Sequence, residues 1–254
     1  MKIIDAFWEE RNLGVTCYEL EPGLADSLEE VAAELDGLAE RQYMVAKIPS
    51  ARYDLVRLFQ DKGYSFIETA IKLEFNYKKL GYKPPEFPNR LQKIYDKCSW
   101  AVMDESDLAQ LSAEINKNMF HTDRIFADPA FTKEQAARSY NLWIKYIIDQ
   151  GYIPRKVVFE HKTIGFFSDK VIAPKVCQGI LGGIYKDSQK PGIGFVRYYA
   201  EFMSRVEDGI EKAIYSASGN NPAALQLSTL FGAEIRGLTY VFVKHVNQNL
   251  YSQP

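Results

Sequence analysis

A proline-rich segment divides the sequence and limits how it can fold. Residues 78–89, KKLGYKPPEFPN, hold three prolines and one glycine. Proline lacks the amide hydrogen that a helix interior or a central strand needs, so neither element can run through this stretch. We therefore expect a connection at 81–96 between a smaller N-terminal domain, 1–80, and a larger C-terminal domain, 97–254.

The N-terminal domain has alternating strand-like and helix-like segments. Apolar runs typical of strands stand at 15–21, 43–49 and 65–77. Apolar residues at helical spacing predict helices at 26–42 and 50–64. The polar segment Trp8–Gly14 is expected to lie on the surface. This order of elements predicts a mixed sheet with helices packed on it.

The C-terminal domain is longer and carries clearer signals. Thr132 and Gln135 have the spacing of a capping box, and the helix that they begin is expected to end at Gly151. His161 falls in a predicted tight turn between two antiparallel strands. The expected strands are 97–103, 155–161, 162–169, 175–187, 212–218 and 233–246, and the expected helices are 104–120, 128–151, 195–209 and 222–232.

Composition argues against several classes of protein. The 254 residues carry a formal net charge of −2, whereas broad nucleic-acid binding needs a basic field. No run approaches the ~18 apolar residues of a membrane span, and the first residues lack the apolar core of a signal peptide. The three cysteines are too far apart for a disulfide framework or a zinc site. We expect a cytoplasmic protein without metal, nucleic-acid or membrane partners, and a homodimer stays open.

A glycine turn stands where a strand is expected to lead into a helix. Residues 188–194 read SQKPGIG. The first turn of a helix has unpaired N–H groups and the positive end of the helix dipole, which together bind anions. Gly192 and Gly194 would let the backbone approach a pyrophosphate closely. Alone, such a pair more often marks an ordinary turn, and it is neither the dinucleotide fingerprint nor a Walker loop.

A second feature follows the next expected strand. In the segment 221–232, NPAALQLSTLFG, Asn221 can cap a helix whose first residue is Pro222. Ala224 and Leu227 fall on one face of that helix, and Gly232 ends it. By itself this segment is an ordinary capped helix.

Together, the two segments resemble the GNAT superfamily of acetyl-CoA-dependent N-acyltransferases. The pyrophosphate loop of that family, Gln/Arg-x-x-Gly-x-Gly/Ala, is matched by Gln189, Gly192 and Gly194. Its next motif, Asn-x-x-Ala-x-x-Leu-Tyr-x-x-x-Gly-Phe, is matched by Asn221, Ala224, Leu227 and Gly232. The order of the expected elements also follows the family from about Lys97 to Val246.

The resemblance implies a fold and a co-substrate. The implied fold is α/β, with a mixed, mostly antiparallel sheet flanked by helices, preceded here by the smaller N-terminal α/β domain. Acetyl-CoA is the implied co-substrate, and backbone N–H groups of the strand CQGILGGIY would hold its acyl oxygen and pantetheine arm. The implied cofactor-binding residues are Ile184, Gln189, Lys190, Gly192, Ile193, Gly194 and Asn221.

The sequence departs from the family motif at two positions. Ser228 stands where the family has a tyrosine that often reprotonates the CoA thiolate, and Ala233 replaces a phenylalanine. A serine hydroxyl is shorter and a much weaker acid than a phenol, whose pKa is ~10. Ser228, the catalytic candidate, would act through water, or another residue such as Tyr198, Tyr199 or Tyr215 would supply the proton. The alternative is a protein that binds acyl-CoA without turnover.

The segment 118–145 resembles the acceptor region of the nucleotide-amino-sugar N-acetyltransferases of the dTDP-fucosamine type, which also carry an extra N-terminal α/β domain. The residues in common are Arg124, Phe126, Asp128, Pro129 and Trp143. We interpret His121, Asp123 and Arg124 as acceptor-binding, and Asp128 and Trp143 as structural. The expected reaction is acetyl transfer to a nucleotide-linked amino sugar. Another small amine or an amino acid as the acceptor stays open.

Overall fold

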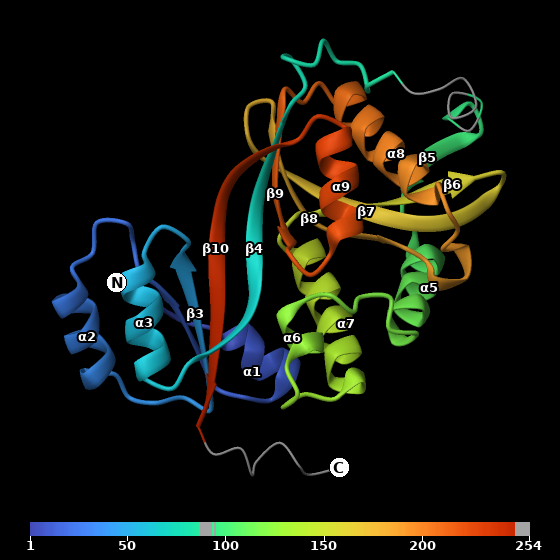
Figure 1. Cartoon of the computed structure of the whole chain (residues 1–254). Helices are drawn as coiled ribbons and strands as arrows, with labels where there is room; N and C mark the ends of the chain where they lie inside the picture. The colour runs from blue at the N-terminus through green and yellow to red at the C-terminus, as the bar shows by residue number, and fades with distance from the viewer. Residues whose placement is uncertain (87–92, 94, 247–254) are drawn as a thin grey trace.

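The computed structural model describes residues 1–86, 93 and 95–246 of the chain. In this part, ten strands form one sheet in the order β1-β2-β3-β10-β4-β9-β8-β7-β6-β5. Neighbouring strands are antiparallel except for β2 with β3 and β8 with β9. Helices pack along the sheet, with α2 and α3 at one end and α8 and α9 towards the other (Figure 1). The expected mixed, mostly antiparallel sheet flanked by helices is confirmed.

Of the first seven elements, five follow the predicted alternation of strands and helices. The other two, β1 and α1, were not predicted from the sequence. Ser27 caps α2 by accepting a hydrogen bond from the Glu30 amide at 3.1 Å. The predicted stop at Gly63 is also present, in the left-handed conformation with φ +83°. The elements are β1 (Lys2–Asp5), α1 (Phe7–Leu13), β2 (Cys17–Glu21), α2 (Leu28–Gly37), β3 (Tyr43–Pro49), α3 (Tyr53–Asp61) and β4 (Ser65–Asn76).

The remaining elements keep the predicted order. The capping box of Thr132 and Gln135 is present at the start of α7, and Asn221 caps α9 through the Ala224 amide at 3.0 Å. The elements are β5 (Cys98–Val102), α5 (Glu105–Asn116), α6 (Arg124–Ala127), α7 (Lys133–Asp149), β6 (Ile153–Phe159), β7 (Lys162–Ala173), β8 (Val176–Ile184), the 3-10 turn η1 (Lys186–Ser188), α8 (Ile193–Glu207), β9 (Lys212–Ser218), α9 (Pro222–Leu230) and β10 (Glu234–His245).

Strand β4 joins the two parts of the chain within the sheet. It comes from the expected N-terminal domain, yet it lies between β9 and β10, antiparallel to both. The long strands β4 and β10 run side by side through the middle of the molecule (Figure 1). Residues 87–92 and 94 of the expected connection lie outside the described residues. The division into two domains stays a prediction, and the sheet itself is continuous across it.

A core of aromatic side chains holds α8 and α9 against the sheet. Phe75 and Tyr77, at the end of β4, pack on Phe202 of α8, with the Tyr77 and Phe202 ring centroids 4.8 Å apart. Phe231, just after α9, is fully buried beside them. Burial of one such ring stabilises the fold by about 1.5–3 kcal/mol. The core therefore fixes the two helices that carry the predicted CoA motifs.

Candidate functional site

A cavity of about 630 Å³ lies where the two parts of the chain meet. On one side are backbone and side chains of β8, β9, α8 and α9. On the other side are Trp8, Glu9 and Asn12 of α1, together with residues of β2, β3, β4, α6 and α7. Trp8–Gly14 was expected on the surface, and this was wrong for several of its side chains: Glu9 and Asn12 are buried and line the cavity.

One side of the cavity is formed where the strands β8 and β9 separate. Their parallel pairing covers only Val176–Gln178 with Lys212–Ile214, although β8 continues to Ile184 and β9 to Ser218. The cavity is lined there by 179–182 and 215–218. The outer edges of the two strands pair with β7 and β4, so their inner edges are the ones that face this opening. Backbone N–H and C=O groups along these edges can bond an extended ligand.

An irregularity in β8 lies at this opening. Ser168 pairs with Leu181 and Asp169 with Gly179, so Ile180 is an extra residue that forms a β-bulge. Ile180 itself lines the cavity. A bulge turns backbone groups out of the regular ladder, and such sites occur often beside active sites. This is the strand from which the sequence predicted backbone N–H groups for an acyl oxygen.

The loop 188–194 leads into α8 as predicted. Gly192 adopts φ +86°, a conformation that favours glycine, and no side chain caps the first turn of the helix. A Cβ on Gly194 would lie 2.6 Å from Leu227 Cδ1, so this glycine allows α8 and α9 to approach. Gly194 and Leu227, one from each sequence motif, are thus neighbours in the fold. Of the predicted cofactor-binding residues, only Asn221 lines the cavity.

Other predicted residues of this loop lie at the surface. Gln189 and Lys190 are exposed, and Gln189 Nε2 donates a 3.4 Å hydrogen bond to the Ile184 carbonyl. Ile184 and Ile193 are half-buried. Their roles in binding CoA stay predictions.

Ser228, the predicted catalytic residue, does not line the cavity. It is fully buried, and its Oγ donates to the Ala224 carbonyl at 2.6 Å. The Tyr198 hydroxyl lies 3.1 Å from Ser228 Oγ and 3.0 Å from the same carbonyl oxygen. Tyr198 lines the cavity from α8, and burial raises the pKa of its phenol. A phenol therefore stands next to position 228, but it comes from another helix.

Glycines of β8 make room for charged side chains of α8. A Cβ on Gly182 would overlap the Arg197 guanidinium, and one on Gly179 would lie 2.7 Å from Arg205 Nη2. Arg205 is 1% exposed and bonds Asp169 at 2.6 Å and Glu201 at 2.5 Å. Burial by itself lowers its pKa, but the two carboxylates raise it well above its ordinary value. Arg205 is therefore a charged part of the core beneath the opening.

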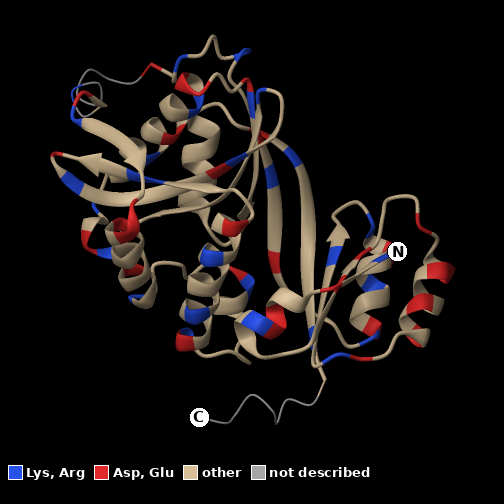
Figure 2. Ribbon diagram, turned by 180° about the vertical axis from the view of Figure 1, so that it is seen from behind, with Lys and Arg blue, Asp and Glu red and all other residues tan. Residues whose placement is uncertain are grey.

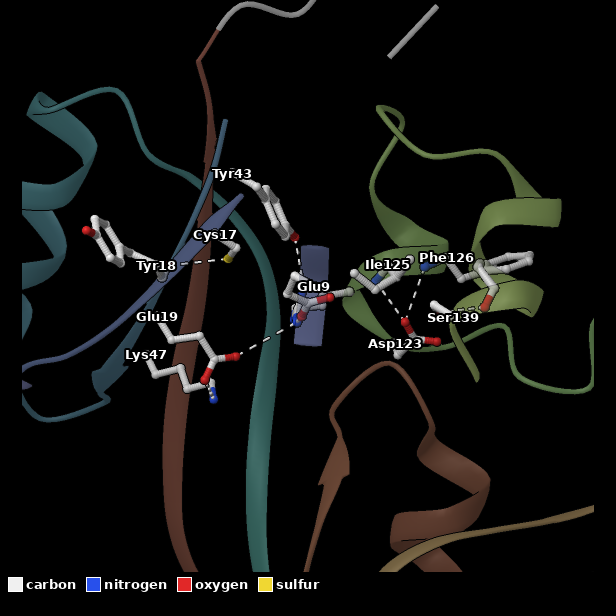
Figure 3. Close-up of polar contacts among 12 residues, drawn as sticks. Glu9, Cys17, Tyr18, Glu19, Tyr43, Lys47, Asp123, Ile125, Phe126 and Ser139 are labelled. Carbon is white, nitrogen blue, oxygen red and sulfur yellow. Dashed lines mark hydrogen bonds and ion pairs between the residues drawn. The ribbon is translucent and has the colours of Figure 1, made fainter. Parts of the chain in front are cut away.

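Arg124, predicted to bind the acceptor, contacts other side chains of the same chain. It forms an ion pair with Glu9, donates to the Tyr43 hydroxyl at 3.0 Å and lies 3.9 Å from Glu19. These three partners are labelled in Figure 3. Burial lowers the pKa of Arg124, but Glu9 and its other partners raise it well above its ordinary value. Its guanidinium thus ties α6 to α1 and to the strands β2 and β3.

Asp123 and His121, the other predicted acceptor residues, differ in position. Asp123 lines the cavity and caps α6, with Oδ1 accepting from the Ile125 amide at 2.7 Å and the Phe126 amide at 3.3 Å (Figure 3). His121 is exposed and does not line the cavity. The sequence segment therefore delivers Asp123 to the cavity and leaves His121 outside it.

The two residues interpreted as structural differ as well. Asp128 is 2% exposed and its Oδ2 lies 2.8 Å from His245 Nε2 near the end of β10, which supports the structural interpretation. Trp143 packs against Tyr140 in the α5–α7 core and also lines the cavity.

Glu68 is a cavity residue that the sequence did not indicate. It stands in β4, is 9% exposed, and accepts a 2.5 Å hydrogen bond from Ser218 Oγ at the end of β9. Burial raises the pKa of its carboxyl, the Ser218 bond opposes this, and the negative charge of Asp123 adds to it. The only sequence signal was a glutamate within a strand pattern, which normally indicates a solvent-facing position.

No family model matches the sequence, and no curated protein matches it. A GCN5-related N-acetyltransferase from Kribbella flavida shares the fold with a TM-score of 0.56 at 14% identity, over 92% of this chain and 83% of its own. Another, from Sphaerobacter thermophilus, has a TM-score of 0.56 at 13% identity over 80% of this chain. The chain spans 59% of the length of that relative.

A third similar structure is a tandem GNAT protein from the clavulanic acid biosynthesis pathway, solved without acetyl-CoA. Its TM-score is 0.51 at 12% identity, with 85% of this chain and 66% of that protein covered. At such identities the likeness establishes the fold alone. The chain has the fold of the GCN5-related N-acetyltransferases.

Proposed function

We propose that the protein transfers an acetyl group from acetyl-CoA to the primary amine of a small molecule. The observation that carries this proposal is the opening between β8 and β9, with the bulge at Ile180, next to a helix whose first turn has no side-chain cap. The inner edge of β8, which no longer pairs with β9 beyond Gln178, suits an extended pantetheine arm. The first turn of α8 suits a pyrophosphate, because its N–H groups are aligned with the helix dipole.

The proposed roles follow the chain. Gln189, Lys190, Gly192 and Gly194 would hold the pyrophosphate, and β8 would bond the pantetheine. The amine attacks the thioester carbonyl carbon, the C–N bond forms and the C–S bond breaks. The CoA thiolate leaves and takes a proton, for which we propose Tyr198 as the donor, since its hydroxyl lies beside Ser228. The nitrogen loses one proton to a base and keeps the other as the amide hydrogen, and Tyr198 regains its proton from solvent.

The acceptor preferred on sequence grounds is a nucleotide-linked amino sugar, and another small amine or amino acid is the rival. A protein that binds acyl-CoA without turnover is the second candidate function, favoured by the burial of Ser228 and the engagement of its hydroxyl. The cavity extends from the opening between β8 and β9 to the N-terminal elements and so leaves room for an acceptor beside the acyl group. This favours turnover, because a protein that only binds acyl-CoA needs no space for an acceptor.

Two measurements test the proposal. Isothermal titration should show acetyl-CoA binding, and a thiol-release assay over an amine panel should show turnover. Binding without thiol release on any amine would favour the non-catalytic protein. A protein that does not bind acetyl-CoA would contradict both candidate functions.

A further inference from the structure

Resting on the proposed function, we infer that Glu68 and Asp123 receive the amino group of the acceptor as an ammonium cation, and that the cavity selects cationic amines that carry no phosphate. This inference goes against the nucleotide-linked acceptor that the sequence segment suggested. It is carried by the charges on the cavity wall and by which of those charges already have partners.

Among the described residues, every basic side chain that lines the cavity is paired with a carboxylate. Arg124 pairs with Glu9, Lys47 Nζ lies 2.7 Å from Glu19 Oε2, and Arg197 Nη2 lies 2.8 Å from Glu201 Oε2. Acidic and basic residues occur near one another on the ribbon in this part of the molecule (Figure 2). The cations of the wall are therefore already engaged and would have to break an ion pair to hold a phosphate.

Two carboxylates of the wall are left without such a partner. Among the described residues, neither Glu68 nor Asp123 forms an ion pair with a basic group within 4.0 Å. The negative charge of Asp123 raises the free energy of the charged form of Glu68, and the more distant positive charge of Arg124 opposes this. In the described part of the chain, the wall holds five carboxylates (Glu9, Glu19, Glu68, Asp123 and Glu201) and three basic groups (Lys47, Arg124 and Arg197). A buried carboxylate without an ion-pair partner is costly, and a bound ammonium ion lowers that cost. A diphosphate would add to it.

The position of Glu68 also fits the transfer reaction. Its carboxylate accepts a hydrogen bond from Ser218, the last residue of β9, where that strand borders the opening between β8 and β9. A substrate ammonium bound there can give one proton to Glu68, which leaves a neutral amine for attack on the thioester carbon. As the nitrogen is acylated it loses a second proton to water and keeps the third as the amide hydrogen. The departing thiolate takes its proton from Tyr198, which regains one from solvent, and Glu68 returns its own proton to solvent. Base catalysis of this kind needs a carboxylate whose charged form is not over-stabilised.

The test compares matched amines on the intact protein. Thiol release should be measured with glucosamine, glucosamine 6-phosphate, ethanolamine, phosphoethanolamine and a nucleotide-linked amino sugar, each with saturating acetyl-CoA. We expect kcat/KM to be at least about tenfold higher for each phosphate-free amine than for its phosphate, since each factor of ten corresponds to one modest charge interaction. Turnover that is equal or faster with the phosphorylated members would overturn the inference and leave the proposed function intact.

Two variants examine the carboxylates, and a third is the control. Glu68→Gln keeps an oxygen acceptor for Ser218, and we expect it to lower kcat/KM by ~100-fold or more, as for loss of a positioned base. Asp123→Asn should raise KM for the amine more than it changes kcat. Glu74→Gln, on the same face of β4 but paired with Arg236 outside the cavity, should change neither.

The affinity for acetyl-CoA and the pH profile separate catalysis from folding. Glu68→Gln should bind acetyl-CoA as the parent protein does, and should lose the acidic limb of kcat/KM. The groups that act on Glu68 in this profile are Asp123, Arg124 and Ser218. An unchanged kcat/KM in Glu68→Gln would overturn the inference. If no amine is acetylated although acetyl-CoA binds, the proposed enzyme is wrong, and the inference with it.

Discussion

The burial of Glu68 is expected to lower the free energy of unfolding by an amount that depends on pH. Burial raises the pKa of its carboxyl above that of an unfolded glutamate, about 4.3. As the pH rises through the folded-state pKa, the folded protein must therefore carry a charge that the unfolded chain carries more easily, and stability is lost. Below both pKa values the carboxyl is protonated in both states and this loss is absent.

We therefore expect Glu68→Gln to raise the urea midpoint at pH 7.5. The difference from the parent protein should shrink towards zero at about pH 4, where the unfolded-state carboxyl is also protonated. Equilibrium urea unfolding at several pH values measures it, with Glu74→Gln as the control. A lower midpoint for Glu68→Gln at pH 7.5 would show that this carboxylate stabilises the fold. Activity and stability would then not be opposed at this residue.

Tyr198 is the residue that we expect to protonate the CoA thiolate. Removing its hydroxyl in Tyr198→Phe should lower kcat by roughly 100-fold and leave acetyl-CoA affinity unchanged. Tyr199→Phe is the matched control, because Tyr199 stacks on Tyr95 and does not line the cavity. Steady-state kinetics and titration separate the two quantities. Equal rates for Tyr198→Phe and the parent would assign the proton to water.

At the scale of an element, the start of α8 carries the expected phosphate site. Gly192 has φ +86°, so any other residue there strains the backbone, and a Cβ would meet no atom within 4 Å. Gly192→Asn and Gly192→Asp share that strain and differ in charge. We expect Gly192→Asp to weaken acetyl-CoA binding by roughly tenfold more than Gly192→Asn. Equal affinities by isothermal titration would place the pyrophosphate elsewhere.

The elements themselves were largely predictable from the sequence, because their signals are local. The capping box at Thr132 and Gln135 and the stop at Gly63 depend on residues within one or two turns. Helix α1 was missed, because Glu9 and Asn12 look like surface residues until α7 and Arg124 cover them. Glu68 was missed for the same reason: the cavity that it faces is made by elements distant in sequence.

At the scale of the whole molecule, the single sheet has a consequence for dissection. A fragment of residues 97–254 would lose β4, which leaves β9 and β10 without the strand between them. We expect this fragment to be insoluble or unfolded by circular dichroism, and the full chain to unfold in one cooperative transition. A soluble fragment with native-like helix content, or two separate transitions of the full chain, would instead support independent domains. The order of strands could not be predicted, because it is set by non-local pairing.

Helices α5 to α9 include none that is both long and apolar enough to cross a membrane, and the same holds for the other described helices. Among the described residues, five carboxylates and three basic groups line one cavity, and β4 places one of these carboxylates, Glu68, next to Ser218.

The double pairing of β4 restricts which changes in its gene can survive. A substitution on this strand affects one side chain, but an inserted or deleted codon shifts the register against β9 and β10 together. Side chains alternate between the faces of a strand, so a shift of one residue beyond the insertion exchanges the two faces. The part of β4 between Glu68, which contacts Ser218, and Phe75 in the aromatic core thus has a fixed number of residues. Related sequences should diverge here by substitution, and gain or lose residues in the loops.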